Sequence, residues 1–185
     1  MEILKPEIDE KSLGNRGDAS RADELVTLIA TAKADAVIQK ILVEKKLVPE
    51  KTILLTADQV VIHNSKILEK PASIAEARKF IESYVQSQCS TVGSIILTDL
   101  ESKKRIIGTS TSTIYFGNIS AEVIEKILIG DDVLYCAGGL MVEHPLLQPY
   151  IERIDGSLNS LMGLCTTLLY SLLDELDNNT TTNKL

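Results

Sequence analysis

The sequence predicts a mixed domain of the α/β or α+β class. Its 185 residues fit one domain, or two small ones, with enough chain to bury a core. Apolar residues make up 44% and charged residues 24%, which is ordinary for a globular protein. Segments of helical period alternate with short β-rich runs, and one hairpin lies near the middle, which together indicate this class.

The first third of the chain predicts one helix and one buried strand. Residues 1–20 are polar and turn-rich and predict no full element. A helix is expected over 21–44, because apolar residues recur there at helical spacing and Ser20 can cap it. Residues 52–62 are rich in Ile, Leu and Val, which favours a short buried strand.

The middle of the chain predicts a capped helix and a hairpin. Ser73 and Glu76 form a capping box in which each side chain can satisfy a free N–H of the other, and a helix over 74–86 follows. The runs 91–98 and 105–116 are β-rich, and the residues between them are polar. An antiparallel hairpin is therefore expected.

The last third predicts four shorter elements and a tail. These elements are a helix over 121–129, strands over 133–137 and 150–154, and a helix over 164–176. Ser120 can cap the first of them and Gly130 can close it. Residues 177–185 are rich in Asn and Thr and are expected to be disordered.

Composition excludes several classes of function. The formal net charge of −7 argues against a nucleic-acid polymer or an anionic membrane as partner. The chain shows no signal peptide, and its longest uncharged stretch is too polar to span a membrane, so a soluble, cytoplasmic protein is expected. Three scattered cysteines and two histidines are too few for a disulfide framework, a Cys-based zinc site or a His-rich metal site.

Three local features could carry chemistry. Asp58 and Gln59 interrupt an apolar strand, where a carboxylate either faces a cleft or forms a structural ion pair. Lys70 stands just before a capped helix, which suits phosphate contact, although a solvated lysine is the commoner case. Gly138 and Gly139 allow close backbone approach shortly before Glu143. The sequence has no Gly-x-x-x-x-Gly-Lys loop, which excludes a P-loop nucleotide site.

Seven segments in a fixed order carry a family resemblance. They are Pro-Glu-Ile-Asp-Glu at 6–10, Ala-Lys-Ala at 32–34, Thr-Ala-Asp-Gln-Val-Val at 56–61, Lys-Pro at 70–71, Thr-Ile-Tyr-Phe at 113–116, Glu-Arg-Ile-Asp-Gly at 152–156 and Met-Gly-Leu at 162–164. Their order and spacing resemble the Maf family of nucleoside triphosphate pyrophosphatases, which is related to the inosine-triphosphatase fold. The resemblance implies a single domain over 1–176, with a central twisted mixed sheet flanked by helices.

The resemblance also implies roles for individual residues. Asp58 matches the family's proton acceptor, which would activate water. Lys33 and Lys70 match lysines that hold phosphates, while Gln59 and Glu143 match positions linked to substrate choice. A base, a positioned water and cations are what cleavage of a phosphoanhydride requires.

A divalent cation, Mg²⁺ or Mn²⁺, is the cofactor that the resemblance implies. Glu10 and Asp58 are the expected contributors to its site. The nucleoside triphosphate is the expected partner, and the family's frequent dimers leave a homodimer open.

The chain departs from the family pattern at its start. The usual first strand and the Ser/Arg-rich loop that grips the triphosphate have no counterpart here, a difference of roughly 20–30 residues. A sheet without that strand should show a new edge. The absent arginines should weaken phosphate binding, at about 1.5–3 kcal/mol for each charge-assisted contact.

Two further departures affect the loops. Glu69 stands where the family has Gly before Lys70, and residues 140–144 replace a Gly-x-x-Ile-Gln-Gly motif. Gln59 and the Cys-Ala-Gly run at 136–138 are more similar to the branch that acts on 7-methyl-GTP than to the dTTP/UTP branch. The Glu-His-Pro run at 143–145 resembles plant members.

The expected function is hydrolysis of a nucleoside triphosphate, modified or non-standard, to the monophosphate and pyrophosphate, which would clean the nucleotide pool. The alternative is a non-catalytic short isoform or truncated remnant that keeps the fold and binds nucleotide weakly or pairs with a full-length subunit. A third interpretation is that the sequence is part of a longer protein.

Overall fold

A five-stranded antiparallel sheet organises the molecule in the order β2-β1-β3-β4-β5. The computed structural model describes residues 2–46 and 48–182. The strands are β1 (Ile53–His63), β2 (Lys66–Leu68), β3 (Gln88–Asp99), β4 (Arg105–Phe116) and β5 (Ile151–Asp155). The main helices are α1 (Ala22–Val43), α2 (Ile74–Ser83), α3 (Ala121–Ile127), α4 (Leu158–Leu161) and α5 (Thr166–Thr182). None of the described helices combines the length and apolarity needed to cross a membrane.

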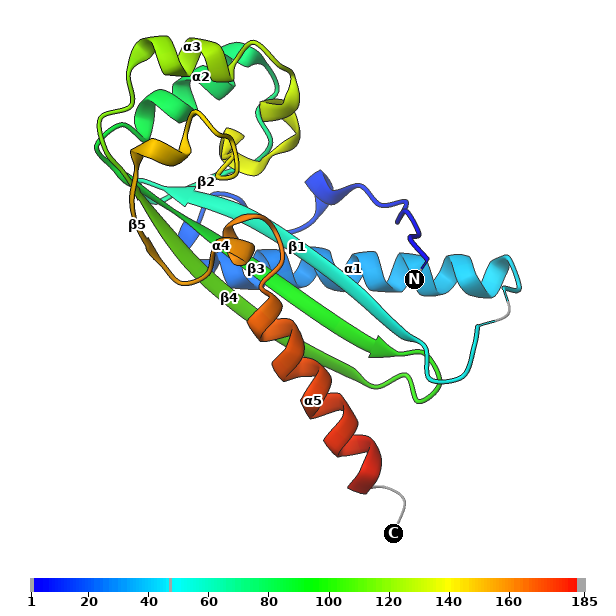
Figure 1. The fold of residues 1–185 in the computed structure, drawn as a ribbon. Helices are drawn as coiled ribbons and strands as arrows, with labels where there is room; N and C mark the ends of the chain where they lie inside the picture. The colour runs from blue at the N-terminus through cyan, green and yellow to red at the C-terminus, as the bar shows by residue number, and fades with distance from the viewer. Residues whose placement is uncertain (1, 47, 183–185) are drawn as a thin grey trace.

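Helix α1 covers one face of the sheet. Leu25, Val26 and Ile29 recur at helical spacing and form a buried cluster with Val60 of β1 and Val92 of β3. In Figure 1 the helix runs along the sheet beside the N-terminal segment. The helix predicted over 21–44 and the strand predicted over 52–62 are therefore confirmed. Their packing also sets which side chains of β1 face α1.

Helix α5 covers the opposite face. Leu172 and Leu176 of α5 are buried against Ile95 and Leu97 of β3. At Gly108 of β4 the absence of a side chain lets the helix approach, because a Cβ there would lie 2.7 Å from Leu168 Cδ1 and 3.2 Å from both Leu172 Cδ atoms. The two helices therefore enclose the hairpin from both sides (Figure 1).

A third core lies at one end of the sheet, in a lobe formed by residues 69–83 and 117–150 (Figure 1). We call it the α2–α3 lobe. Tyr84 and Phe116 stack at 6.0 Å between ring centroids in its base, and the Tyr84 hydroxyl donates to the Gly138 carbonyl at 2.8 Å. This buried hydrogen bond fixes the glycine-rich segment against the sheet.

The sheet differs from the predicted one in strand direction. The described pairings are all antiparallel, so the expectation of a mixed sheet is wrong. Consecutive strands β3 and β4 joined by a short turn must run antiparallel, and β5 returns beside β4. Because the three-residue β2 covers only the end of β1, residues 53–60 have no strand partner on that side among the described residues and form an edge of the sheet.

Two predicted segments take other conformations. Residues 133–137 are not a strand: a 3₁₀ turn, η3 (Asp132–Tyr135), leads into a second, η4 (Ala137–Gly139). Gly138 and Gly139 have φ of 62° and 59°, which excludes extended backbone there. The last helix is also longer than predicted, because α5 continues to Thr182, beyond buried Leu176, and does not end at residue 176. The disorder expected over 177–185 stays a prediction. Residues 183–185 lie outside the described residues.

The helix caps are partly as predicted. Ser73 and Ser120 accept hydrogen bonds from Glu76 N–H and Val123 N–H, although the Glu76 carboxylate bonds the N–H of Ala72, one residue earlier than in the predicted box. Ser20 caps no helix: Asp18 caps a 3₁₀ turn, η2 (Ala19–Arg21), that leads into α1. Helix α3 ends at Ile127, so Gly130 does not close it.

The contact at Gly108 gives a test of the packing of α5. We expect Gly108→Val to destabilise the protein by about 1–3 kcal/mol, because the added side chain overlaps Leu168 and Leu172. Urea unfolding measures the loss. Thr109→Val, at the exposed neighbour, is the control and should change stability by less than about 0.5 kcal/mol. Equal stability of both variants would show that α5 does not rest on this position.

Candidate active site

Asp58 faces α1 because side chains alternate along β1. Two positions before it, the Thr56 hydroxyl donates to the Ala30 carbonyl of α1 at 2.9 Å, which ties helix to strand. Lys33 lies three residues farther along the helix, so its Nζ reaches Asp58 Oδ1 at 2.6 Å. The side chains of Lys33 and Asp58 are only 17% and 10% exposed, so the ion pair is largely shielded from water.

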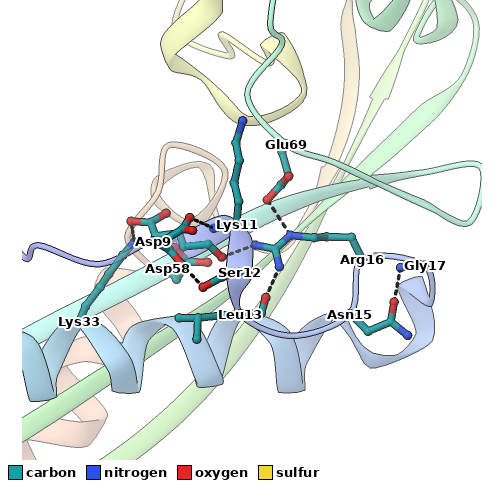
Figure 2. A network of polar contacts seen from close by, with 11 residues as sticks. Asp9, Lys11, Ser12, Leu13, Asn15, Arg16, Gly17, Lys33, Asp58 and Glu69 are labelled. Atoms are coloured by element: carbon teal, nitrogen blue, oxygen red, sulfur yellow. Dashed lines mark hydrogen bonds and ion pairs between the residues drawn. The ribbon is translucent and has the colours of Figure 1, made fainter.

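The N-terminal segment adds a second carboxylate to this pair. Glu10 begins the 3₁₀ turn η1 (Glu10–Ser12), which Asp9 caps. Lys33 Nζ lies 3.1 Å from Glu10 Oε1, and the ammonium therefore bridges Glu10 and Asp58. Figure 2 shows Lys33, Asp58 and the η1 turn together, with the Lys11 side chain extending toward the α2–α3 lobe.

Burial and charge oppose each other at this pair. Burial raises the pKa of the Asp58 carboxyl above its usual range, and the hydrogen bond and charge of Lys33 offset this only in part. Burial alone would lower the pKa of Lys33, but Asp58, followed by Glu10, outweighs it and leaves that pKa raised. Lys33 thus keeps its charge at neutral pH, while Asp58 is a stronger base than a solvated aspartate.

The arrangement of Glu10 and Asp58 fits a divalent cation. Both carboxylates already converge on one positive charge, the Lys33 ammonium. The described residues contain no group of three or more His, Cys, Asp or Glu side chains suited to a metal. Two carboxylates, with substrate phosphates and water completing the shell, are the usual protein contribution to a Mg²⁺ site.

Lys70 and Glu143 come from the α2–α3 lobe. Lys70 is exposed in the loop between β2 and α2, and the preceding Glu69 carbonyl accepts the Gly138 N–H at 2.9 Å. Burial raises the pKa of the Cys136 thiol, and so does the charge of Glu143, while Lys70 acts against them. Lys70 and Glu143 therefore both lie close enough to Cys136 for their charges to act on its thiol.

Gln59 lies on the other face of the sheet. Its amide donates to the Ser160 carbonyl at 2.9 Å, beside the short helix α4. Adjacent strand residues point to opposite faces, so the structure does not bring Gln59 to Asp58 and Lys33. Its link to substrate choice stays a prediction.

Sequence reasoning missed Arg16 at this site. Its Nε donates to Glu69 Oε1 at 3.0 Å, and its charge acts on the Asp58 carboxyl. Figure 2 shows the Arg16 side chain between the N-terminal segment and the Glu69 loop. Arg16 lies in a polar segment without periodicity, so its own surroundings give no signal. The unexpected Glu69 before Lys70 was the signal that a cationic partner was needed there.

Comparison with known proteins assigns the chain to a family. A model of the family described as Maf-like protein matches residues 1–176, and the chain belongs to that family. A 7-methyl-GTP pyrophosphatase of Dictyostelium discoideum is 32% identical over 175 residues, which cover 95% of this chain and 86% of that protein. A dTTP/UTP pyrophosphatase of Clostridium tetani is 26% identical over 179 residues, covering 97% and 88%. A nucleoside triphosphate pyrophosphatase of Salinispora tropica is 27% identical over 176 residues, covering 95% and 74%.

The shielded ion pair predicts a pH-dependent loss of stability in Lys33→Met. Without the ammonium, Asp58 and Glu10 repel each other, and we expect a loss of about 2–3 kcal/mol at neutral pH, somewhat below the cost of breaking a fully buried pair. The pKa of Asp58, already raised by burial, should rise further. The folded variant then binds this proton more tightly than its unfolded chain, so the loss shrinks as the pH falls through the Asp58 pKa.

Urea unfolding between neutral pH and about pH 4, the usual carboxyl range, measures this trend. Lys40→Met is the matched control, because Lys40 pairs with exposed Glu7 and such pairs contribute little. A loss in Lys33→Met that does not change with pH would contradict the assignment to Asp58.

Proposed function

We propose that this chain is a nucleoside triphosphate pyrophosphatase, which releases a nucleoside monophosphate and pyrophosphate. One observation carries the proposal: a carboxylate of raised pKa, Asp58, is held by Lys33 beside a second carboxylate, Glu10. Membership of the Maf family and the names of the relatives support the same reaction.

In this proposal Asp58 accepts a proton from the attacking water. Its raised pKa brings its basicity closer to that needed near neutral pH. Lys33 keeps the carboxylate oriented and places positive charge next to the reacting phosphate. Lys70, exposed on the lobe side, supplies a second positive charge for the leaving pyrophosphate.

Glu10 and Asp58 would hold the divalent cation, Mg²⁺ or Mn²⁺, that this class of reaction uses. When bound, the cation would neutralise charge that develops on the phosphate oxygens. The convergence of the two carboxylates on one ammonium supports this assignment.

We propose a modified guanosine triphosphate as the substrate class. The Dictyostelium relative is named for 7-methyl-GTP. A 7-methylated guanine carries a positive charge, and the exposed Glu143 carboxylate in the lobe is a suitable partner for it. We also propose a cytoplasmic location and, where a dimer forms, a homodimer.

A purely binding role is the second candidate, and it is not favoured. A chain that only bound nucleotide would gain nothing from a shielded carboxylate of raised pKa, which costs stability. A turnover assay with the purified chain separates the two candidate functions.

Asp58→Asn tests whether Asp58 is the catalytic base. We expect turnover to fall by about a hundredfold or more, because an amide cannot accept the proton. The assay incubates the purified chain with Mg²⁺ or Mn²⁺ and a panel of standard and modified triphosphates, and it distinguishes pyrophosphate from orthophosphate. Asp35→Asn is the control, since Asp35 pairs with Arg105 at the surface.

Full turnover by folded Asp58→Asn would remove Asp58 from the mechanism. No turnover by the folded, unmodified chain would favour the binding role.

Glu143→Gln tests which nucleobase the site prefers. A single charge pair near the surface contributes on the order of 1 kcal/mol. We therefore expect about a fivefold loss in the ratio of kcat/KM for 7-methyl-GTP to that for GTP, with unfolding unchanged. Glu122→Gln, at an exposed position of α3, should leave the ratio as it is. An unchanged ratio in Glu143→Gln would place base recognition elsewhere.

A further inference from the structure

Arg16 donates hydrogen bonds to three oxygens of the protein itself. Besides the bond from Nε to Glu69, its Nη2 donates to the Glu10 carbonyl at 2.6 Å and its Nη1 donates to the Leu13 carbonyl. The Arg16 and Glu69 side chains are 21% and 41% exposed. All three guanidinium nitrogens therefore bond to protein oxygens, and the geometry is that of a brace rather than of a phosphate ligand.

The two segments that Arg16 joins carry different parts of the site. One of its bonds goes to the backbone of Glu10, whose carboxylate faces Lys33 and Asp58. Another goes to Glu69, the neighbour of Lys70. We propose that Arg16 and Glu69 act together as positioning residues, which hold the Glu10 carboxylate and the Lys70 loop in a fixed relation. This inference rests on the proposed function.

The N-terminal segment needs such a brace because it has little other regular structure. Residues 2–18 contain no strand, and η1 is their only complete helical turn in the described structure. Ile8 and Leu13 pack partly against the cluster beneath α1. The ion pairs of Glu2 and Glu7 with lysines of and just beyond α1 are at exposed positions and hold the segment weakly. The Arg16 bonds and the ion pair with Lys33 are therefore the main contacts that hold Glu10.

The charge of Arg16 also explains how Glu69 is tolerated. A free carboxylate next to Lys70 would repel the phosphates that we propose Lys70 contacts. Paired with Arg16, Glu69 is neutralised and its carboxylate points to the N-terminal segment, as Figure 2 shows. Each partner thus depends on the other, and loss of either should affect the site in the same way.

A double-mutant cycle with Arg16→Gln, Glu69→Gln and the double variant tests this dependence. The first measurement is Mn²⁺ binding to the nucleotide-free chain, followed by electron paramagnetic resonance. We expect each single variant to bind Mn²⁺ roughly tenfold more weakly, as is typical when a residue that orients a metal ligand is lost. The double variant should lose about the same factor as each single one, because both changes break one unit.

Hydrogen exchange is the second measurement, and it does not depend on metal or nucleotide. Glu69→Gln should increase exchange in residues 8–16, and Arg16→Gln should increase it in residues 66–72, because each segment loses its tie to the other. Lys40→Gln is the matched control: it removes another ion pair of the N-terminal segment and should change neither Mn²⁺ binding nor exchange near Lys70.

Other outcomes overturn the inference. Multiplicative losses in the double variant would mean that Arg16 and Glu69 act separately. Normal Mn²⁺ binding and normal exchange in both single variants would mean that the pair is only a surface contact. If the unmodified chain hydrolyses no triphosphate, the proposed function fails, while Mn²⁺ binding and exchange still decide whether Arg16 positions Glu10.

Discussion

The ion pair between Lys33 and Asp58 is the interaction on which the site depends. A carboxylate on the inner part of a sheet would be costly to bury alone, so it requires a cation at hydrogen-bonding distance. That cation must come from α1, which fixes how the helix lies along β1. The bond of Thr56 to the Ala30 carbonyl sets the same alignment one turn earlier. Packing and chemistry are therefore specified by one contact between helix and strand.

Contacts of charged side chains, rather than strand pairing, hold the N-terminal segment at the site. Within the described residues, the long edge of β1 has no strand partner over 53–60, and residues 2–18 form no strand beside it. Glu10 is held by Lys33 from one side and through its backbone by Arg16 from the other. Such contacts are more sensitive to charge changes than apolar packing is, which suits the anionic phosphates and the cation that we propose for this site.

Much of the fold followed from local pattern. Helical spacing of apolar residues predicted α1, β-rich composition predicted β1 and the β3–β4 hairpin, and a capping box predicted α2. Short elements were less predictable. Residues 133–137 look like a strand, but they lie in 3₁₀ turns, and the two glycines that follow have positive φ. Leu172 and Leu176 anchor α5 to the sheet, which composition does not reveal.

The sequence by itself determined the candidate residues and the family to which they point, because an acid within an apolar strand and a lysine before a capped helix are local signals, and the order of the seven family segments is written in the chain. Only the tertiary structure decided which of them meet. Asp58 and Gln59 are adjacent in sequence, yet alternation along β1 and the different helices on each face send them to opposite sides of the sheet. Arg16 and Glu69 are 53 residues apart and form one ion pair. Such contacts depend on how helices and loops pack over the sheet, and no spacing within a single segment encodes that packing.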